Sequence, residues 1–299
     1  MNNQKEANFS FCSFISNFSN IFFVRLFVII LFLTILHKSI YAKEIVYSGN
    51  AIQSGMIKLE IPERVKQLIL DDKELNFSQN IAYIGFSRSD TLVHHLQFVF
   101  NDGSIKEEIL QLEERSYDIQ KIENIPKKYV EKPKDEELIN RVNLEYQIIT
   151  DVRKNIIYPN KNLYFIDIEQ PLVSRISSVF GSQRIINGIP KRPHFGIDYA
   201  AKIGTPIKNC ADGIVVLTGD FFYNGKFILI DHGVGLSSIY IHLDEIQVHI
   251  GQKVEKGENI GTVGNTGKST GPHLHWGFYW YEKALDPLLI WEMFGKEKP

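Results

Sequence analysis

The sequence predicts a mainly β protein: a C-terminal compact β-sandwich or open barrel, preceded by a small β domain and a linker helix. Its 20 Phe and 13 Tyr against 3 Met favour a β-rich interior, because aromatic side chains suit pleated surfaces. From about residue 165, closely spaced glycines separate short β-branched runs such as G-I-V-V-L (213–217) and F-I-L-I-D (227–231). This pattern is typical of strands joined by tight turns.

The composition is that of an ordinary globular protein. The chain has 299 residues, enough for about two domains, with 44% hydrophobic and 23% charged residues. The formal net charge is −2, and no block of basic residues alternates with aromatic ones. We therefore expect no nucleic-acid partner.

The N-terminal segment has the pattern of a secretory signal peptide. Arg25 precedes the apolar run L-F-V-I-I-L-F-L-T-I-L (26–36), and the small residue Ala42 follows. As a helix the run would span about 16 Å, which is short of a bilayer core. We predict a signal peptide over 1–42, cleaved near Ala42. The alternative is an uncleaved membrane anchor that includes residues 21–24, and only then do we expect contact with a membrane.

The sequence holds two cysteines, Cys12 and Cys210. Cleavage near Ala42 would leave Cys210 alone, so no intramolecular disulfide is expected. An exported domain without disulfides must be stabilised by its hydrophobic core or by a bound metal. We interpret Cys210 as a small buried hydrophobic residue.

Residues 43–115 are predicted to form the small β domain, with a regulatory role as one option. The segment M-I-K-L-E-I (56–61) alternates in polarity, and L-I-L-D-D-K-E-L (68–75) has a turn at its acidic centre. Residues 96–110 have the pattern of a hairpin, with Asn101-Asp102-Gly103 as its turn. His94 and His95 lack neighbours at ligand spacing, so we interpret them as structural or surface residues.

Residues 116–164 are predicted to be a linker that contains one amphipathic helix. The stretch up to 134 is polar and holds Pro126 and Pro133. The acidic residues 135–137 suit a helix N-terminus, and the apolar residues that follow fall mostly on one helical face. We expect a helix over 134–155 that lies between the domains and uses its apolar face for packing.

The predicted C-terminal domain, residues 165–292, contains the candidate metal-binding and catalytic residues. His194 and Asp198 form one cluster, and His273 and His275 form another directly after Gly271-Pro272. In a strand, side chains at i and i+2 leave the same face, so both histidines can reach one site. Catalytic zinc takes three protein ligands from His and Asp or Glu and leaves a position for water. His194, Asp198 and one histidine of the H-x-H pair make such a set.

The histidine left over from that pair suits proton transfer. Bound zinc lowers the pKa of its water to roughly 7 and polarises a scissile carbonyl. Proton transfer by a positioned side chain adds about 10²–10⁴ in rate. The segment Y-I-H-L (240–243) supplies a further candidate, since Tyr240 and His242 are expected to share a strand face.

The ordered motifs resemble the lysostaphin-type (LytM-like) zinc metallopeptidases, whose members cut peptide bonds in bacterial peptidoglycan. The resemblance is dense over roughly 170–290. It rests on H-F-G-I-D (194–198), G-T-P-I (204–207), A-D-G-I-V (211–215), Y-I-H-L (240–243), V-E-K-G-E-N-I-G (254–261), G-N-T-G-K-S-T-G-P-H-L-H (264–275) and D-P (286–287). Upstream, R-S-Y-D-I-Q-K-I (115–122) and F-G-S-Q-R-I-I-N-G (180–188) resemble exported proteobacterial members that carry an N-terminal β domain.

The resemblance implies a peptidoglycan endopeptidase with one Zn²⁺ per chain. It implies zinc ligation by His194, Asp198 and His275, with His242 and His273 catalytic. By analogy, the location is the periplasm of a Gram-negative bacterium, or its inner membrane facing the periplasm if the N-terminal segment is uncleaved. The bond is then expected to be a D,D cross-link of the stem peptides. N-terminal regions can cover the groove in related enzymes, so intramolecular inhibition is a further expectation.

Four more residues complete the interpretation. Tyr240, Arg184 and Asn187 are candidates to bind substrate in the groove, and His232 is interpreted as structural or as support for the site.

The alternative to an enzyme is a non-catalytic scaffold that binds peptidoglycan or activates other hydrolases. That alternative predicts missing ligands, whereas all five metal and catalytic positions are filled here.

Overall fold

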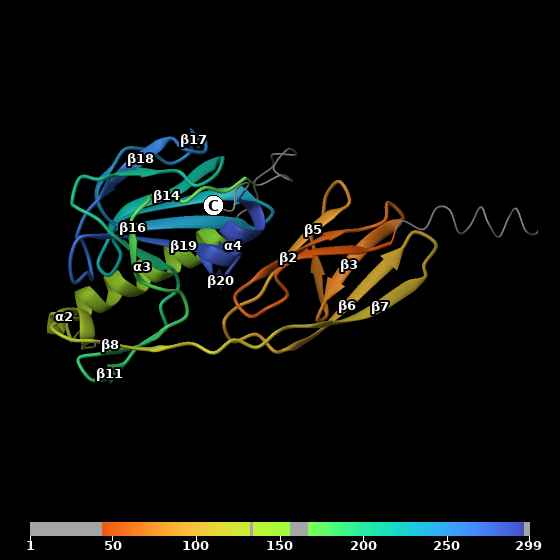
Figure 1. The fold of residues 1–299 in the computed structure, drawn as a ribbon, viewed down its shortest axis with the longest axis horizontal. Coiled ribbons are helices and arrows are strands. Elements are labelled where there is room, and N and C mark those ends of the chain that lie inside the picture. The colour runs from red at the N-terminus through yellow and green to blue at the C-terminus, as the bar shows by residue number, and fades with distance from the viewer. Residues whose placement is uncertain (1–43, 132–133, 156–166, 296–299) are drawn as a thin grey trace, which may run out of the picture. The chain divides into compact units, whose positions relative to one another are not determined.

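The computed structural model describes residues 44–131, 134–155 and 167–295 (Figure 1). These residues are mainly β, as the sequence predicts, with few helices and a large antiparallel sheet. The predicted signal peptide or anchor over 1–42 lies outside the described residues. Within them, no helix is both long and apolar enough to cross a bilayer.

The upstream β region forms two small antiparallel sheets. Its strands are β1 (Val46–Gly49), β2 (Met56–Glu60), β3 (Val65–Leu70), β4 (Lys73–Leu75), β5 (Ile81–Gly85), β6 (Val93–Phe100) and β7 (Ile105–Gln111). The first sheet has the order β1-β2-β5 and the second has the order β4-β3-β6-β7.

Both predicted turns of this region are observed. Asp71 and Asp72, with φ of 47° and 66°, join β3 to β4, and Gly103, with φ of 84°, closes the hairpin from β6 to β7. His94 is buried and its Nδ1 lies 2.5 Å from Asp71 Oδ2, whereas His95 is exposed. His94 is therefore part of the local packing, and His95 lies at the surface.

The segment predicted to be a linker also contains a strand and a second, short helix. β8 (Ile119–Ile122) pairs in parallel with β10 (Gln183–Ile186), which also pairs with β11 (Ile189–Pro190). The short helix α2 (Lys127–Val130) follows, with Pro126 as its N-cap residue. The sequence did not indicate β8, because this strand pairs with one about sixty residues later. The boundaries at 115/116 and 164/165 remain predictions.

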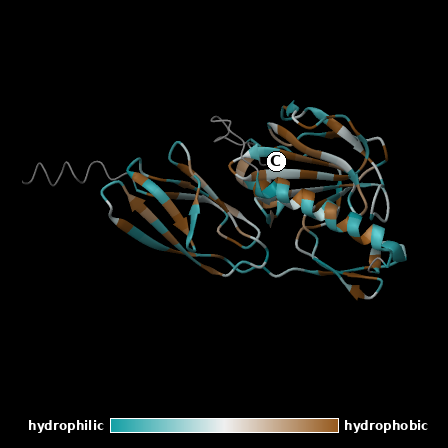
Figure 2. Ribbon diagram, turned by 180° about the vertical axis from the view of Figure 1, so that it is seen from behind, coloured by the Kyte–Doolittle hydropathy of each residue, from teal (hydrophilic) through white to brown (hydrophobic). Residues whose placement is uncertain are grey.

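The predicted helix is observed as α3 (Glu136–Lys154). Asp135 caps it, since its side chain accepts a hydrogen bond from the Leu138 amide at 3.2 Å. Figure 2 shows hydrophobic and hydrophilic bands alternating along this helix. Ile149 and Val152 pack on a cluster in the C-terminal sheet that includes Leu217, Phe227, Leu229, Ile239 and Ile241.

The C-terminal region is built on a ten-stranded sheet that is antiparallel throughout. Its strands are β9 (Arg175–Ser178), β12 (Ile197–Ala200), β13 (Pro206–Lys208), β14 (Gly213–Phe221), β15 (Gly225–Gly233), β16 (Leu236–Ile246), β17 (Lys253–Val254), β18 (Asn259–Val263), β19 (His273–Trp280) and β20 (Lys283–Leu285). The main path runs β17-β14-β15-β16-β19-β12-β9, so that β12, β19 and β16 are neighbours. Fully buried aromatic residues, among them Trp276 and Phe278, fix β19 in the core.

The last helix, α4 (Pro287–Phe294), explains the D-P motif. Asp286 caps it by accepting from the Leu288 amide at 3.0 Å, and Pro287 occupies the first turn, where no amide donor is needed. Asp286 Oδ2 also accepts from Arg115 at 2.9 Å. Through this hydrogen bond, the motif connects the end of the upstream β region to the C-terminal region.

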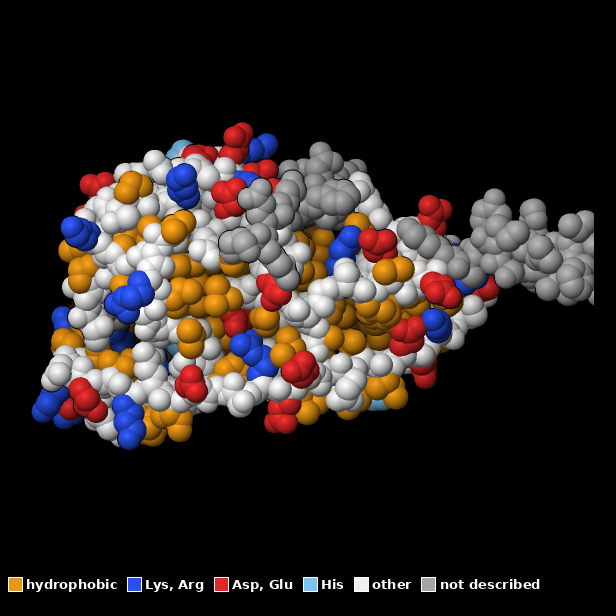
Figure 3. All heavy atoms as spheres, in the orientation of Figure 1, with side chains coloured by type: hydrophobic (Ala, Val, Ile, Leu, Met, Phe, Trp, Pro, Cys, Tyr) orange, Lys and Arg blue, Asp and Glu red, His pale blue; other side chains and the backbone are white. Residues whose placement is uncertain are grey.

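The charged side chains do not form a single-sign surface in the view of Figure 3. There, acidic and basic residues are interspersed among hydrophobic and uncharged ones on the face shown.

Candidate active site

Three side chains from neighbouring strands converge on one point. The register of β12 on β19 places Asp198 opposite His275, and His194 lies just before β12. His194 Nε2 lies 3.0 Å from Asp198 Oδ1 and 2.8 Å from His275 Nδ1, and His275 Nδ1 lies 2.8 Å from the same carboxylate oxygen. All three residues are buried, so three potential ligand atoms face one another away from solvent.

The surroundings orient these atoms for a metal. His194 Nδ1 lies 2.9 Å from the carbonyl of Val179, which can only accept, so this nitrogen carries the proton and Nε2 keeps its lone pair. Ser178 Oγ lies 3.0 Å from the same nitrogen. Arg184 Nη2 donates to Asp198 Oδ2 at 3.0 Å, which leaves Oδ1 directed at the histidines. Two imidazoles and a carboxylate, each oriented in this way, fit one zinc ion.

The charge states also suit a metal. Burial disfavours a charged Asp198, but His194 and His275 outweigh it and hold the pKa of this carboxyl well below its usual range. Burial lowers the pKa of His275 to about 4, although Asp198 opposes the shift. At neutral pH the site therefore offers an ionised carboxylate and a neutral His275 imidazole, the forms that bind a metal.

His273 lies on the same face of β19 as His275, as the i, i+2 spacing predicts. Its Nε2 lies 3.8 Å from Asp198 Oδ1, while its Nδ1 lies 2.8 Å from the Gly271 carbonyl. His242 lies beside it, with 4.8 Å between the ring centroids, and its Nδ1 lies 2.8 Å from the Thr266 carbonyl. Both histidines thus donate through Nδ1 and present Nε2 to the site. Burial first, and then His273 and His275, lower the pKa of His242 to about 3.

Tyr240 does not line the groove, which corrects the expectation from the sequence. It is fully buried, and its hydroxyl accepts from the Cys210 amide at 3.0 Å and from Ser238 at 3.2 Å. His242 has a left-handed backbone, with φ of 65°, and the register of β15 on β16 shifts between the pairs that flank it. The alternation of side chains therefore fails between Tyr240 and His242, and the two residues face different environments.

The other candidates separate into residues at the site and residues away from it. Arg184 lines the cavities beside the triad. Asn187 does not; its side chain bonds the backbone of Ile125 twice, at 3.2 and 2.8 Å. His232 is buried in the core, where its Nε2 lies 2.7 Å from Ser238 Oγ. Burial raises the pKa of the Cys210 thiol to about 11, in line with a structural role.

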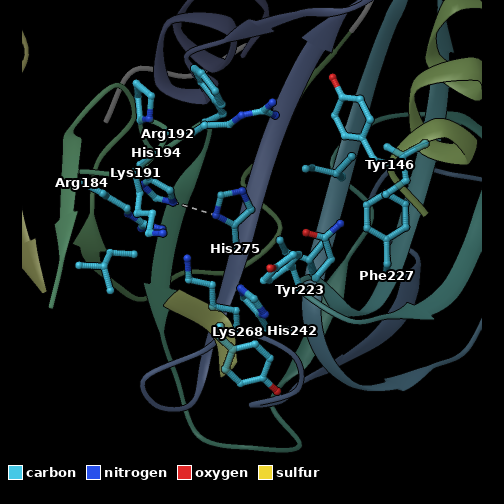
Figure 4. Close-up of a pocket in the computed structure, with 18 of the residues that line it drawn as sticks. Tyr146, Arg184, Lys191, Arg192, His194, Tyr223, Phe227, His242, Lys268 and His275 are labelled. Carbon is cyan, nitrogen blue, oxygen red and sulfur yellow. Dashed lines mark hydrogen bonds between the residues drawn. The ribbon is translucent and has the colours of Figure 1, made fainter. Parts of the chain in front are cut away.

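Two cavities, of about 490 Å³ and 300 Å³, share His242 and His275 among their lining residues. Figure 4 shows the larger one. The segment 119–131 contributes to both: Tyr129 and Val130 to the larger, Gln120 and Ile122 to the smaller. Tyr146 and Ile149 of α3 also line the larger one. Among the described residues, none of β1–β7 lines either cavity. The walls contributed from upstream are therefore the linker and α3.

Sequence reasoning missed three contributors to this site. Lys268 lies inside the quoted G-N-T-G-K-S-T-G segment and lines both cavities. The carbonyl of Val179 orients His194, and no side-chain pattern could reveal a backbone contact. Gly196 leaves room for the His275 ring, because a Cβ at position 196 would lie 2.5 Å from His275 Nε2. Only the H-x-G-x-D spacing offered a signal for this glycine.

Comparison with known proteins shows what the region around the site is similar to. Residues 192–287 match the model of Peptidase family M23. Peptidoglycan DD-endopeptidase ShyA of Vibrio cholerae serotype O1 is 47% identical over 104 residues, which are 34% of this chain and 24% of that relative. DD-carboxypeptidase/endopeptidase Mpg of Neisseria gonorrhoeae is 43% identical over 110 residues, which are 37% of this chain and 25% of Mpg. The chain thus spans about a quarter of the length of these relatives.

A solved structure extends the likeness beyond the matched segment. A crystal structure from Pseudomonas aeruginosa, described as an M23 peptidase, aligns with a TM-score of 0.61 at 27% identity. The alignment covers 81% of this chain and 95% of that one. Such coverage must include residues well upstream of 192.

We predict that Gly196→Ala weakens zinc binding about 10- to 100-fold, because the added methyl displaces the His275 ring from its partners. The measurement is zinc affinity by competition with a chelator. Gly271→Ala is the matched control, since a Cβ there meets nothing within 4 Å. Equal affinities in the two variants would contradict the role given to Gly196.

Proposed function

We propose that this chain, whose residues 192–287 match peptidase family M23, is a zinc endopeptidase that hydrolyses peptide cross-links of bacterial peptidoglycan. One observation carries the proposal: a buried His-Asp-His triad lies with two further histidines where two cavities meet. The named activity of the relatives ShyA and Mpg supports a D,D-endopeptidase.

In this proposal His194, Asp198 and His275 hold the metal. When bound, zinc supplies Lewis-acid activation of water and of the scissile carbonyl. Arg184 keeps Asp198 oriented through its hydrogen bond to Oδ2. The carbonyl of Val179 keeps His194 in the tautomer that offers Nε2.

His242 and His273 carry the protons. Each has Nδ1 fixed on a backbone carbonyl and Nε2 directed at the site. A neutral imidazole nitrogen at this position can accept a proton from water and deliver one to the leaving amine. The two cavities on either side of these rings have room for the peptide on each side of the scissile bond.

Variants of individual histidines test these roles. We expect His275→Ala to lose bound zinc and cleavage together, because a ligand is missing. His242→Ala should keep one zinc but cleave about 10²–10⁴ times more slowly. Zinc is measured by elemental analysis, and the products released from purified peptidoglycan are measured by mass.

The control is His249→Ala, which removes an exposed histidine and should change neither readout. A His275→Ala protein that holds zinc and cleaves like the parent would contradict the ligand assignment. A parent chain that holds zinc and binds peptidoglycan without releasing products would instead favour the scaffold alternative.

We further propose that the linker restrains the enzyme by narrowing the groove. Residues 119–131 line both cavities and are fixed to the C-terminal region by several contacts. Asn187 bonds the backbone of Ile125, Lys191 Nζ donates to the Val130 carbonyl, and the Tyr129 ring lies 5.2 Å from that of Phe222. Ile125 and Val130 pack on Ile186 in a small apolar cluster.

Loosening the linker should therefore raise activity on intact peptidoglycan. Asn187→Gly removes two hydrogen bonds, each worth about 1 kcal/mol, while it keeps the left-handed backbone at φ of 49°. We expect up to about tenfold faster release of soluble fragments.

Asn124→Gly is the matched control. It makes the same change at φ of 65° within the linker itself, where the side chain forms no hydrogen bond to a described residue. Unchanged or slower release by Asn187→Gly would mean that the linker is a permanent wall of the groove.

We infer that residues 1–42 direct export to the periplasm. The basic flank, short apolar run and Ala42 support this, as does a substrate that lies outside the inner membrane. N-terminal sequencing of the exported protein should begin near Lys43. A start at Met1 would indicate an anchor.

A further inference from the structure

Lys268 occupies the point where the two cavities meet. It lies in the loop between β18 and β19 and, with Arg184, His242 and His275, lines both cavities. Figure 4 shows its side chain beside His242, extending toward the wall that carries Arg184 and Lys191. Lys268 therefore borders the reaction centre, and it is only partly exposed.

Lys268 is also a cation without a counter-charge. Arg184 pairs with Asp198 at 3.0 Å, and Lys191 donates to the Val130 carbonyl. Lys268 forms no ion pair and no side-chain hydrogen bond with any described residue. Burial, and then Lys191 and Arg184, lower the pKa of Lys268 to about 8. The three cations thus repel one another, and Lys268 has no carboxylate partner among the described residues.

The lining of the larger cavity also carries more positive than negative charge. Five of its lining residues are Lys or Arg, namely Arg153, Arg184, Lys191, Arg192 and Lys268, and its one carboxylate belongs to Glu131, which is exposed. Asp198, which lines the smaller cavity, is committed to the triad and Arg184. A bound divalent metal adds further positive charge. The ligand complementary to this centre is an anion.

We propose that Lys268 binds a carboxylate that the substrate carries on the same carbon as the leaving nitrogen. This rests on the proposed endopeptidase function and deepens it. In a cross-link between D-alanine and the side-chain amine of diaminopimelate, the carbon that bears the scissile nitrogen also bears a free carboxylate. That carboxylate lies two bonds from the scissile nitrogen, so it must bind next to the reacting amide. Lys268 is placed to meet it there, because it lines both cavities together with His242 and His275.

The proposal makes Lys268 a determinant of which bond is cut. In a glycine bridge, the carbon after the scissile nitrogen carries only the next amide, so no anion would meet Lys268. A lysine next to an uncharged substrate would stay desolvated without a partner, which is unfavourable. The enzyme should therefore discriminate against cross-links that lack this carboxylate.

The test compares two soluble cross-linked peptide dimers with the zinc-loaded full chain. They are identical except that the carbon bearing the scissile nitrogen carries a carboxylate in one and a carboxamide in the other. We expect the parent to prefer the carboxylate dimer about 10- to 100-fold in kcat/KM, the range of a charge-assisted hydrogen bond. Lys268→Gln should lose this preference, chiefly through a lower kcat/KM for the carboxylate dimer.

Two further variants keep the test decisive. Lys268→Arg retains the charge and should retain most of the preference, whereas Lys253→Gln removes an exposed lysine and should change nothing. Zinc content and thermal unfolding verify that each variant is folded. An equal loss on both dimers in Lys268→Gln would overturn the proposal, because Lys268 would then act on the reacting carbonyl. A parent without preference would overturn it as well.

A binding measurement separates this proposal from the proposed function. If the parent cleaves neither dimer, the endopeptidase function fails, but calorimetry with the His242→Ala protein still decides the role of Lys268. Tighter binding of the carboxylate dimer, lost in the His242→Ala/Lys268→Gln double variant, supports the proposal. Equal binding of the two dimers, or binding of neither, overturns it.

Discussion

The antiparallel register of β12 on β19 is the constraint on which the site depends. It sets Asp198 opposite His275, and Tyr199 and Leu274 opposite each other on the face that enters the core. Because side chains alternate along a strand, a slip of one residue would move the ligands into the core and the core residues to the site. Packing of the buried face therefore also holds the metal ligands in place, and the same register brings His273 to the site with His275.

The regular part of this arrangement could be predicted from the sequence. Glycine spacing and β-branched runs indicated the fold class, and the H-x-H spacing placed both histidines on one face. The prediction failed at Tyr240, because the argument from i, i+2 spacing assumes a regular strand. His242 has a φ of 65°, so the backbone there rotates out of the alternation. A backbone irregularity of this kind leaves no mark in the pattern of residue types.

The linker shows a second limit of sequence reasoning. Its polar composition and prolines indicated a linker and gave no sign that β8 pairs in parallel with β10 or that Asn187 bonds the backbone at Ile125. Both contacts join residues about sixty positions apart, and each involves backbone groups that every residue possesses. Lys268 was missed for a related reason: in a glycine-rich loop a lysine usually points to solvent, and only the fold brings it to Arg184 and Lys191.

The central claim is that His194, Asp198 and His275 hold one zinc ion beside His242 and His273. Anomalous diffraction at the zinc edge, from crystals of the zinc-loaded full chain, tests it most directly. The account predicts one peak, within about 2.0–2.2 Å of His194 Nε2, Asp198 Oδ1 and His275 Nδ1. A peak held by other side chains, or zinc-loaded protein without a peak at this triad, would contradict it.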